Sequence, residues 1–253
     1  MNVIGDLVAR ERRSDAIALR TDSRAGSYSY AKCCTNAWKA GNLLRHYGVR
    51  GDATVAVDAG PTDRDTTPPP ILALLGASLL GATVSFDPEE TADSDETTAV
   101  RELVAPTDRL DRYDPAPGTQ VLGYGSVPDA AEVVHFEEQL WSENPTEPPD
   151  VVAPDAVVLT AGGTAFTHER LLDAAETVVE EYGLDTESEV ALRAPLASPG
   201  AVVAGVLAPL RAGGTVLLDR SRTGTVAVAA SGIDAPEESV VDPETVVDPE
   251  TVV

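Results

Sequence analysis

Short, continuous apolar runs alternate with longer segments of helical periodicity along much of this chain. Residues 55–57 and 216–218 are runs of the first kind, whereas residues 71–80 and 201–210 are apolar almost all round. Continuous apolar runs indicate strands of a parallel sheet that is covered on both faces. A helix that is apolar on every side indicates burial. The pattern predicts an α/β fold with mostly parallel sheets flanked by helices.

The same order of features occurs twice. The first copy starts at Ser29 and the second at Thr164. In each copy we expect a hydroxyl cap, a helix, an apolar strand, an apolar helix, a glycine and a second strand before an aspartate, over residues 29–87 and 164–219. A repeat of this kind predicts two similar α/β subdomains.

Proline content and composition divide the chain into four predicted parts. These are a first α/β subdomain at residues 1–143, a linker at 144–154, a second subdomain at 155–232 and an acidic repeat tail at 233–253. Because proline recurs in the tail, we expect the tail to be flexible or to dock at a sheet edge. Further expectations are an exposed acidic loop at 89–96 and strands at 101–104 and 119–124. No secondary structure is assigned to the short aromatic segment at 135–141.

Charge sets the expected surroundings of the protein. The chain has 42 Asp and Glu against 18 Lys and Arg, a formal net charge of −24. So acidic a surface repels itself unless salt screens it, which favours a halophilic cytoplasm. A functional acidic tail or a basic protein partner is the alternative, although the acids are spread along the chain. Nucleic acid as a partner is excluded because clustered Lys and Arg are missing. No apolar run has the length of a membrane span and no leader is recognised, so we expect no membrane contact.

Several common sites find no support in the sequence. Cys33 and Cys34 are adjacent within a predicted helix and should be reduced, because neighbours on a helix point to different faces. The three histidines, at 46, 135 and 168, lack the spacing of metal ligands. The chain has no Gly-x-Ser-x-Gly elbow and no Walker lysine. We therefore expect no metal site and none of these catalytic motifs.

The candidate site is a glycine segment after the apolar run at 157–159. It consists of Thr160, Ala161, Gly162, Gly163 and Thr164, and a predicted helix follows it. Backbone N–H groups that glycine leaves accessible, together with the positive end of a helix, can surround a phosphate. An ordinary tight connection between a strand and a helix needs the same residues, so both interpretations stay open.

Two pieces of sequence resemble a known phosphate loop. Residues 160–164 and 167–171 (Thr-His-Glu-Arg-Leu) resemble Thr-Ser-Gly-Thr-Thr-Gly-x-Pro-Lys-Gly-Val followed by Thr-His-x-Asn-Leu in the adenylate-forming (AMP-binding) superfamily. That superfamily contains acyl-CoA synthetases, luciferases and peptide-synthetase adenylation domains. The resemblance continues at residues 48–57, 73–84 and 207–216.

The resemblance implies the two-subdomain N-terminal domain of an acyl-CoA synthetase and an AMP-forming carboxylate–CoA ligase chemistry. It also implies ATP or AMP with Mg²⁺ as ligands, and an acyl pocket bordered by Ser198 and Gly200.

The chain departs from the superfamily pattern at the catalytic positions. The Pro-Lys-Gly portion of the loop is missing, and later segments that bind adenine, ribose and magnesium are not found. Adenylation needs placed cations to stabilise the transferring phosphoryl group, so we assign no catalytic residue. Arg170 is interpreted as a solvated helix residue and His168 as a polar neighbour of the helix cap.

Three functional hypotheses follow. The first is a truncated, catalytically inactive relative that binds a nucleotide or an acyl ligand, or that regulates a full-length synthetase or associates with itself. The second is an AMP-forming acyl-CoA ligase that works only with a second chain. The third is a structural assembly subunit without a ligand. A family resemblance favours the first two hypotheses without establishing either, because fold does not imply function.

Overall fold

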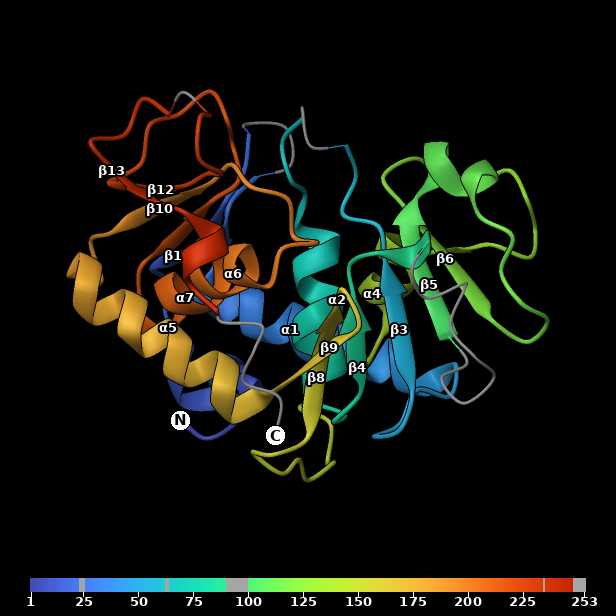
Figure 1. Cartoon of the computed structure of the whole chain (residues 1–253). Coiled ribbons are helices and arrows are strands. Elements are labelled where there is room, and N and C mark those ends of the chain that lie inside the picture. Colours follow the sequence, from blue (N-terminus) through green and yellow to red (C-terminus); the bar gives the residue numbers. More distant parts are fainter. Residues whose placement is uncertain (23–25, 62–63, 90–99, 234, 248–253) are drawn as a thin grey trace.

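Two sheets organise the molecule. The computed structural model describes residues 1–22, 26–61, 64–89, 100–233 and 235–247, and it confirms the α/β fold with mostly parallel sheets (Figure 1). The first sheet, sheet A, has the order β13-β12-β10-β11-β1-β2 and the second, sheet B, has the order β7-β6-β5-β3-β4-β8-β9. All neighbouring strands are parallel except the two hairpins, β1–β2 and β8–β9.

The strands of sheet A are β1 (Ile17–Arg20), β2 (Tyr28–Ser29), β10 (Glu189–Leu192), β11 (Thr215–Leu217), β12 (Val226–Val228) and β13 (Ser239–Val241). Those of sheet B are β3 (Thr54–Val57), β4 (Thr83–Ser85), β5 (Val100–Pro106), β6 (Gln120–Tyr124), β7 (Val134–His135), β8 (Val157–Ala161) and β9 (Thr164–Thr167). The α-helices are α1 (Tyr30–His46), α2 (Pro68–Ser78), α4 (Phe136–Ser142), α5 (His168–Tyr182), α6 (Pro199–Val202) and α7 (Ala208–Ala212). Short 3-10 helices are η1 (Ile4–Val8), η2 (Arg10–Arg12), η4 (Thr107–Arg112) and η6 (Pro243–Thr245), and η5 (Val203–Leu207) is a π-helix.

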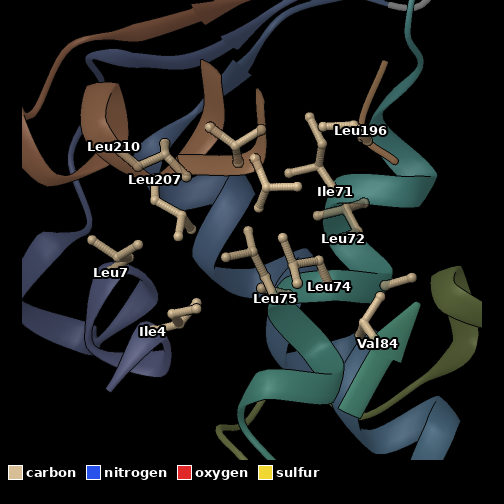
Figure 2. Packing of buried hydrophobic residues seen from close by; sticks show 14 of the residues in the cluster. Ile4, Leu7, Ile71, Leu72, Leu74, Leu75, Val84, Leu196, Leu207 and Leu210 are labelled. Atoms are coloured by element: carbon tan, nitrogen blue, oxygen red, sulfur yellow. The ribbon is translucent and has the colours of Figure 1, made fainter. Parts of the chain in front are cut away.

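Helix α2 lies in the centre of the core, as its sequence predicts. All of its residues are buried, and prolines occupy its first turn, where no amide donor is needed. Figure 2 shows side chains of α2 gathered with Leu207 and Leu210 from the C-terminal half and with Ile4 and Leu7 from η1. One continuous hydrophobic cluster therefore joins both halves of the chain.

The second apolar helix departs from the prediction of one helix over residues 201–210. A π-helical turn, η5, separates α6 from α7. Pro209 explains the interruption, because in a regular α-helix its ring would collide with the carbonyl of residue 205. The wider turn directly before α7 removes that conflict. Gly213, with φ of 84°, then ends the helix in the left-handed conformation.

The repeat is present, and its two copies exchange their hairpins. Hairpin β1–β2, which precedes α1, joins sheet A beside β11, and hairpin β8–β9, which precedes α5, joins sheet B beside β4. Each copy therefore starts in the sheet that contains the later strands of the other copy. The sheets do not divide the chain at the predicted linker, because both contain strands from each side of residues 144–154.

The helix caps place the second copy three residues later than predicted. Ser29 caps α1 and its side chain accepts from the N–H of Lys32, as expected. In the second copy Thr167, rather than Thr164, caps α5 and accepts from the N–H of Arg170. Thr164 instead begins β9, so the structure corrects the start of this copy.

The remaining predictions have mixed outcomes. Strands β5 and β6 form where they were expected, and the segment at 135–141, to which no structure was assigned, falls mostly in α4. Glu89 is exposed, whereas residues 90–96 of the predicted acidic loop lie outside the described residues. Residues 239–247 of the tail are docked: β13 pairs with β12 at the edge of sheet A and η6 follows. Cys33 and Cys34 are free, buried thiols in α1. Among the helices described, none has the length and apolar content to cross a bilayer.

Candidate functional site

The candidate phosphate segment forms the tip of hairpin β8–β9. Ala161 pairs with Thr164 across the turn, and Gly162 and Gly163 have φ of 57° and 73°. A two-residue turn between antiparallel strands favours positive φ at both positions, which glycine adopts without strain. Both glycines are exposed, and a Cβ on either would meet no atom of the described residues within 4 Å. The tip therefore lies at the surface of the described part of the chain.

Strand β9 separates this tip from the helix that was expected to follow it directly. The four residues of β9 at about 3.3 Å each put the first turn of α5 roughly 13 Å from the turn. The helix N-terminus therefore does not face the candidate segment. Phe166 gives the physical reason, because its side chain is buried while its neighbour Ala165 is exposed. Alternation of this kind is the signature of a strand, and the sequence contained it.

Arg170 is placed at the helix end of β9. Its guanidinium lies 5.0 Å from the ring centroid of Phe166, a cation–π contact. On the other side of the hairpin, Thr160 pairs with Ser85 of β4, which is buried. Residues 160–164 thus offer backbone groups and threonine hydroxyls, and none of the five carries a charge.

His168 is a buried structural residue. It lies in the first turn of α5 and its Nδ1 accepts a hydrogen bond of 3.1 Å from the N–H of Ile4. Burial lowers the pKa of this imidazole to about 4, and the nearby Asp6 acts in the opposite direction. The neutral side chain therefore links η1 to α5 through this hydrogen bond. The sequence had suggested only a polar neighbour of the helix cap.

Ser198 and Gly200, the predicted acyl-pocket residues, lie at the start of α6. Ser198 occupies the N-cap position and Gly200 is buried. A Cβ on Gly200 would overlap the carbonyl oxygen of Pro243, so the backbone of the tail lies directly against this glycine. The tail fills that side of the predicted pocket. The two residues belong to the half built on sheet A, whereas the glycine hairpin belongs to sheet B.

A charged cluster at the carboxyl end of β10 was not predicted from the sequence. Arg193 follows β10 directly, is buried, and donates from Nε to Oε2 of Glu237 over 2.9 Å. A second bond joins its Nη2 to Oε1 of the same carboxylate, which also accepts from the N–H of Gly224 at 3.0 Å. The guanidinium additionally donates to the carbonyls of Arg220 and Arg222. A lone arginine directly after an apolar strand was the available signal.

Two other features lie away from the hairpin. An open cavity of about 530 Å³ at the carboxyl ends of β1 and β11 is lined by Arg20, Thr21, Asp22, Gly26, Ser27, Asp65, Asp219, Ser221 and Arg222. Glu102 of β5 is fully buried, and neither carboxylate oxygen has a hydrogen-bond partner among the described residues. Burial raises its pKa to about 9. In the part of the chain that the structure describes, no three His, Cys, Asp or Glu side chains meet as metal ligands.

Comparison with known proteins finds similarity in structure alone. No family model and no curated protein sequence matches the chain. The solved structure of the anthranilate CoA ligase AuaEII in complex with anthranoyl-AMP matches 90% of this chain with a TM-score of 0.77 and 17% identity. A benzoate CoA ligase from Burkholderia xenovorans LB400 matches 91% with a TM-score of 0.75 and 20% identity. The inhibitor-bound N-terminal domain of FACL13 from Mycobacterium tuberculosis matches 94% with a TM-score of 0.72 and 18% identity.

The TM-scores show a shared fold, and at these low identities they show the fold alone. The chain spans 49% and 50% of the two full ligases and 68% of the FACL13 domain. The expected architecture, that of the N-terminal domain of acyl-CoA synthetases, is thereby confirmed.

Proposed function

We propose that this chain, which has the fold of an acyl-CoA synthetase N-terminal domain, binds a nucleotide or an acyl-adenylate without catalysing adenylation by itself. The observation that supports the proposal is the superposition of 90% of the chain on a ligase that holds anthranoyl-AMP. The hairpin at Gly162 and Gly163 supplies a surface glycine turn in a segment that resembles a phosphate loop.

The chemistry of the hairpin fits binding better than catalysis. Backbone N–H groups and the hydroxyls of Thr160 and Thr164 suit hydrogen bonds to phosphate oxygens. Stabilising charge on a transferring phosphoryl group requires Lys, Arg or Mg²⁺ at the reacting atoms. Residues 160–164 provide no cation and no carboxylate to hold Mg²⁺, so no step is assigned to the metal. A turn without these groups can hold a phosphate but cannot by itself stabilise the bond-forming step.

The test is calorimetric titration of ATP, AMP and a non-hydrolysable acyl-adenylate analogue in about 1 M KCl with Mg²⁺, since salt at that level screens the acidic surface. Gly163→Trp places a large side chain on the turn. Gly118→Trp is the matched control, because Gly118 also has a positive φ, 95°, and no described atom lies within 4 Å of a Cβ placed on it.

Binding that persists in Gly118→Trp and disappears in Gly163→Trp would support the site. Absence of binding by all three ligands would overturn the proposal and favour the structural assembly subunit. Binding that is unchanged in Gly163→Trp would contradict the hairpin as the binding site and would show that the ligand binds elsewhere.

A second candidate is a ligase that is active only with another chain, because residues 160–164 carry none of the cations that adenylation needs. Affinity purification from the native source, followed by mass spectrometry, would test this candidate. A copurifying polypeptide that confers AMP release from ATP and a carboxylate would favour the ligase, whereas a full-length synthetase whose own activity changes would favour regulation.

A further inference from the structure

Half of the cations of this acidic chain belong to its first 50 residues. Residues 1–50 hold nine of the 18 Lys and Arg but four of the 42 Asp and Glu. Helix α1, which lies within this stretch, contains Lys and Arg and has no Asp or Glu. Charge that is distributed so unevenly along a chain indicates a charged interaction surface.

The structure gathers several of these cations on one side of α1. Lys32 is exposed and Lys39 is half-buried, and the two lie seven residues apart, which is about two turns or 10 Å of helix. The exposed Arg10 and Arg13 lie over the ring of Trp38 in the same helix, 5.9 and 5.3 Å from its centroid. Within the described part of the chain, none of these four cations forms an ion pair with a carboxylate. We call them the α1 basic face.

An exposed aromatic side chain adjoins the α1 basic face. Trp141 of α4 is 86% exposed. Its carbonyl accepts a hydrogen bond of 2.7 Å from Nζ of Lys39, and this ammonium lies 5.7 Å from the centre of its ring. Tryptophan is among the residues that contribute most to protein–protein binding, because its large apolar side chain loses water on contact. The combination therefore fits an acidic protein surface as its partner.

Helix α5 carries the complementary charge. It is the equivalent helix in the second copy of the repeat, and it runs along the outside of the molecule (Figure 1). Three of its acids, Glu169, Asp173 and Glu180, are exposed and form no ion pair with a cation of the described residues. We call them the α5 acidic face. Asp173 and Glu180 are seven residues apart, the same spacing as the two lysines of α1.

We propose that the α1 basic face binds the α5 acidic face of a second copy of this chain, with Trp141 at the margin of the contact. Each molecule carries both faces, so the contact occurs twice in a two-fold dimer or is repeated from molecule to molecule in a ring or filament. Nucleic acid is the less favoured occupant, because the rest of the surface is strongly acidic.

Physiological salt permits such a contact between two acidic molecules. At about 0.15 M salt the Debye length is about 8 Å, so repulsion between whole molecules is screened while charges in direct contact still attract. Complementary charge also fixes the register of the two surfaces. One helix against another buries less than the roughly 1,200 Å² of a standard interface, so the association is weak and dilute protein is monomeric.

Charge reversal tests the two faces separately and together. Lys32→Glu with Lys39→Glu reverses the basic face, and Asp173→Lys with Glu180→Lys reverses the acidic face. Sedimentation velocity in about 0.15 M KCl, over a roughly hundredfold range of concentration, measures association of the full chain. The parent chain should associate as its concentration rises. Each reversed variant alone should bind itself about tenfold more weakly or worse, because its two faces then have the same sign.

An equimolar mixture of the two reversed variants should associate again, because each reversed face then meets a face of opposite charge. Asp111→Lys with Glu132→Lys is the control, since it changes the net charge as much as Asp173→Lys with Glu180→Lys does. Both control residues are exposed and lie outside α1 and α5, so this variant should associate at least as well as the parent chain.

Tryptophan fluorescence gives a second readout. Trp38 is 2% exposed and Trp141 is 86% exposed, so a shift of emission to shorter wavelength on association reports Trp141. Trp141→Phe should abolish this shift.

Three results would overturn the proposal. They are a parent chain that stays monomeric at every concentration, reversed variants that each associate as the parent chain does, and a mixture of reversed variants that stays monomeric. A monomeric parent chain that binds polyglutamate or single-stranded DNA, and loses this binding in Lys32→Glu with Lys39→Glu, would assign the α1 basic face to a partner other than a second copy.

Discussion

The backbone N–H of Ile4 donates a hydrogen bond to Nδ1 of His168, and this bond joins the beginning of the chain to the first turn of α5 across 164 sequence positions. Both residues are fully buried. Because Nδ1 accepts, the neutral ring carries its proton on Nε2. Protonation of Nδ1 would remove the acceptor of Ile4 and place a charge in the core.

This arrangement predicts a loss of stability in acid. The folded pKa of His168 is lowered to about 4, so its contribution is fully present above its unfolded pKa and is lost as the pH falls from about 6.5 through about 4. The loss should approach about 3 kcal/mol of unfolding free energy. Urea unfolding at several pH values and constant KCl, compared for the parent chain and His168→Asn, measures it.

His168→Asn keeps an acceptor near Ile4 and should flatten this part of the pH profile. His46→Asn is the control, because His46 is exposed at the end of α1. Equal slopes for the parent chain and His168→Asn would contradict the assignment.

Replacing Gly76 of α2 by alanine should change the stability in the direction opposite to the one that helix propensity predicts. A Cβ at this position would lie 2.6 Å from the backbone nitrogen of Gly41 in α1, because the two helices cross with their backbones in contact. Gly76→Ala should therefore destabilise the protein by about 1–3 kcal/mol through overpacking, although alanine favours an isolated helix.

Chemical denaturation at fixed salt measures the effect of Gly76→Ala. In the control, Gly51→Ala, the nearest atom to the new Cβ is 3.6 Å away, and the expected change is within about 0.5 kcal/mol. A stabilised Gly76→Ala variant would mean that α1 and α2 can separate at little cost.

Local chemistry made part of the fold predictable. The burial of α2, the glycine that ends α7 and the hydroxyl cap at Ser29 follow from periodicity and capping rules. The exchange of hairpins did not follow, because the sheet that an edge hairpin joins depends on strands far away in the sequence. Strand β9 was missed for a different reason: four residues between a turn and a helix give a weak period-2 signal.

The candidate site was predictable only as a segment. Gly162 and Gly163 were recognised from composition and resemblance, but the hairpin geometry that turns them away from α5 depends on pairing with β8. The contact between Gly200 and Pro243 required knowledge of where the tail docks. Arg193 and Glu237 are far apart in sequence, and nothing local to either indicates the other.

The net charge of −24 predicts that salt stabilises the protein. Raising KCl from about 0.1 M to about 1 M shortens the Debye length from about 10 Å to about 3 Å and screens repulsion among surface carboxylates. The urea midpoint should rise over this range at pH 7. Sucrose favours burial without screening charge, so it separates charge screening from a general strengthening of burial. A midpoint that responds only to sucrose would contradict the halophilic interpretation.

Glu102 predicts a loss of stability as the pH rises. Its folded pKa is raised to about 9, with burial as the main cause and Arg101 acting against it. The folded state therefore binds more protons than the unfolded state between about pH 4.5 and pH 9, so stability falls across this window. At pH 7 the cost is about 3 kcal/mol. Glu102→Gln keeps the shape of the protonated carboxyl and should remove this slope.

Urea unfolding of Glu102→Gln at pH 5 and pH 8, in constant KCl, is the measurement. The variant should be close to the parent chain at pH 5 and more stable at pH 8. Glu180→Gln is the control, because Glu180 is exposed on α5 and its replacement should shift neither value by more than about 0.5 kcal/mol. An unchanged difference between pH 5 and pH 8 in Glu102→Gln would mean that Glu102 is ionised in the fold and that a cation outside the described residues compensates it.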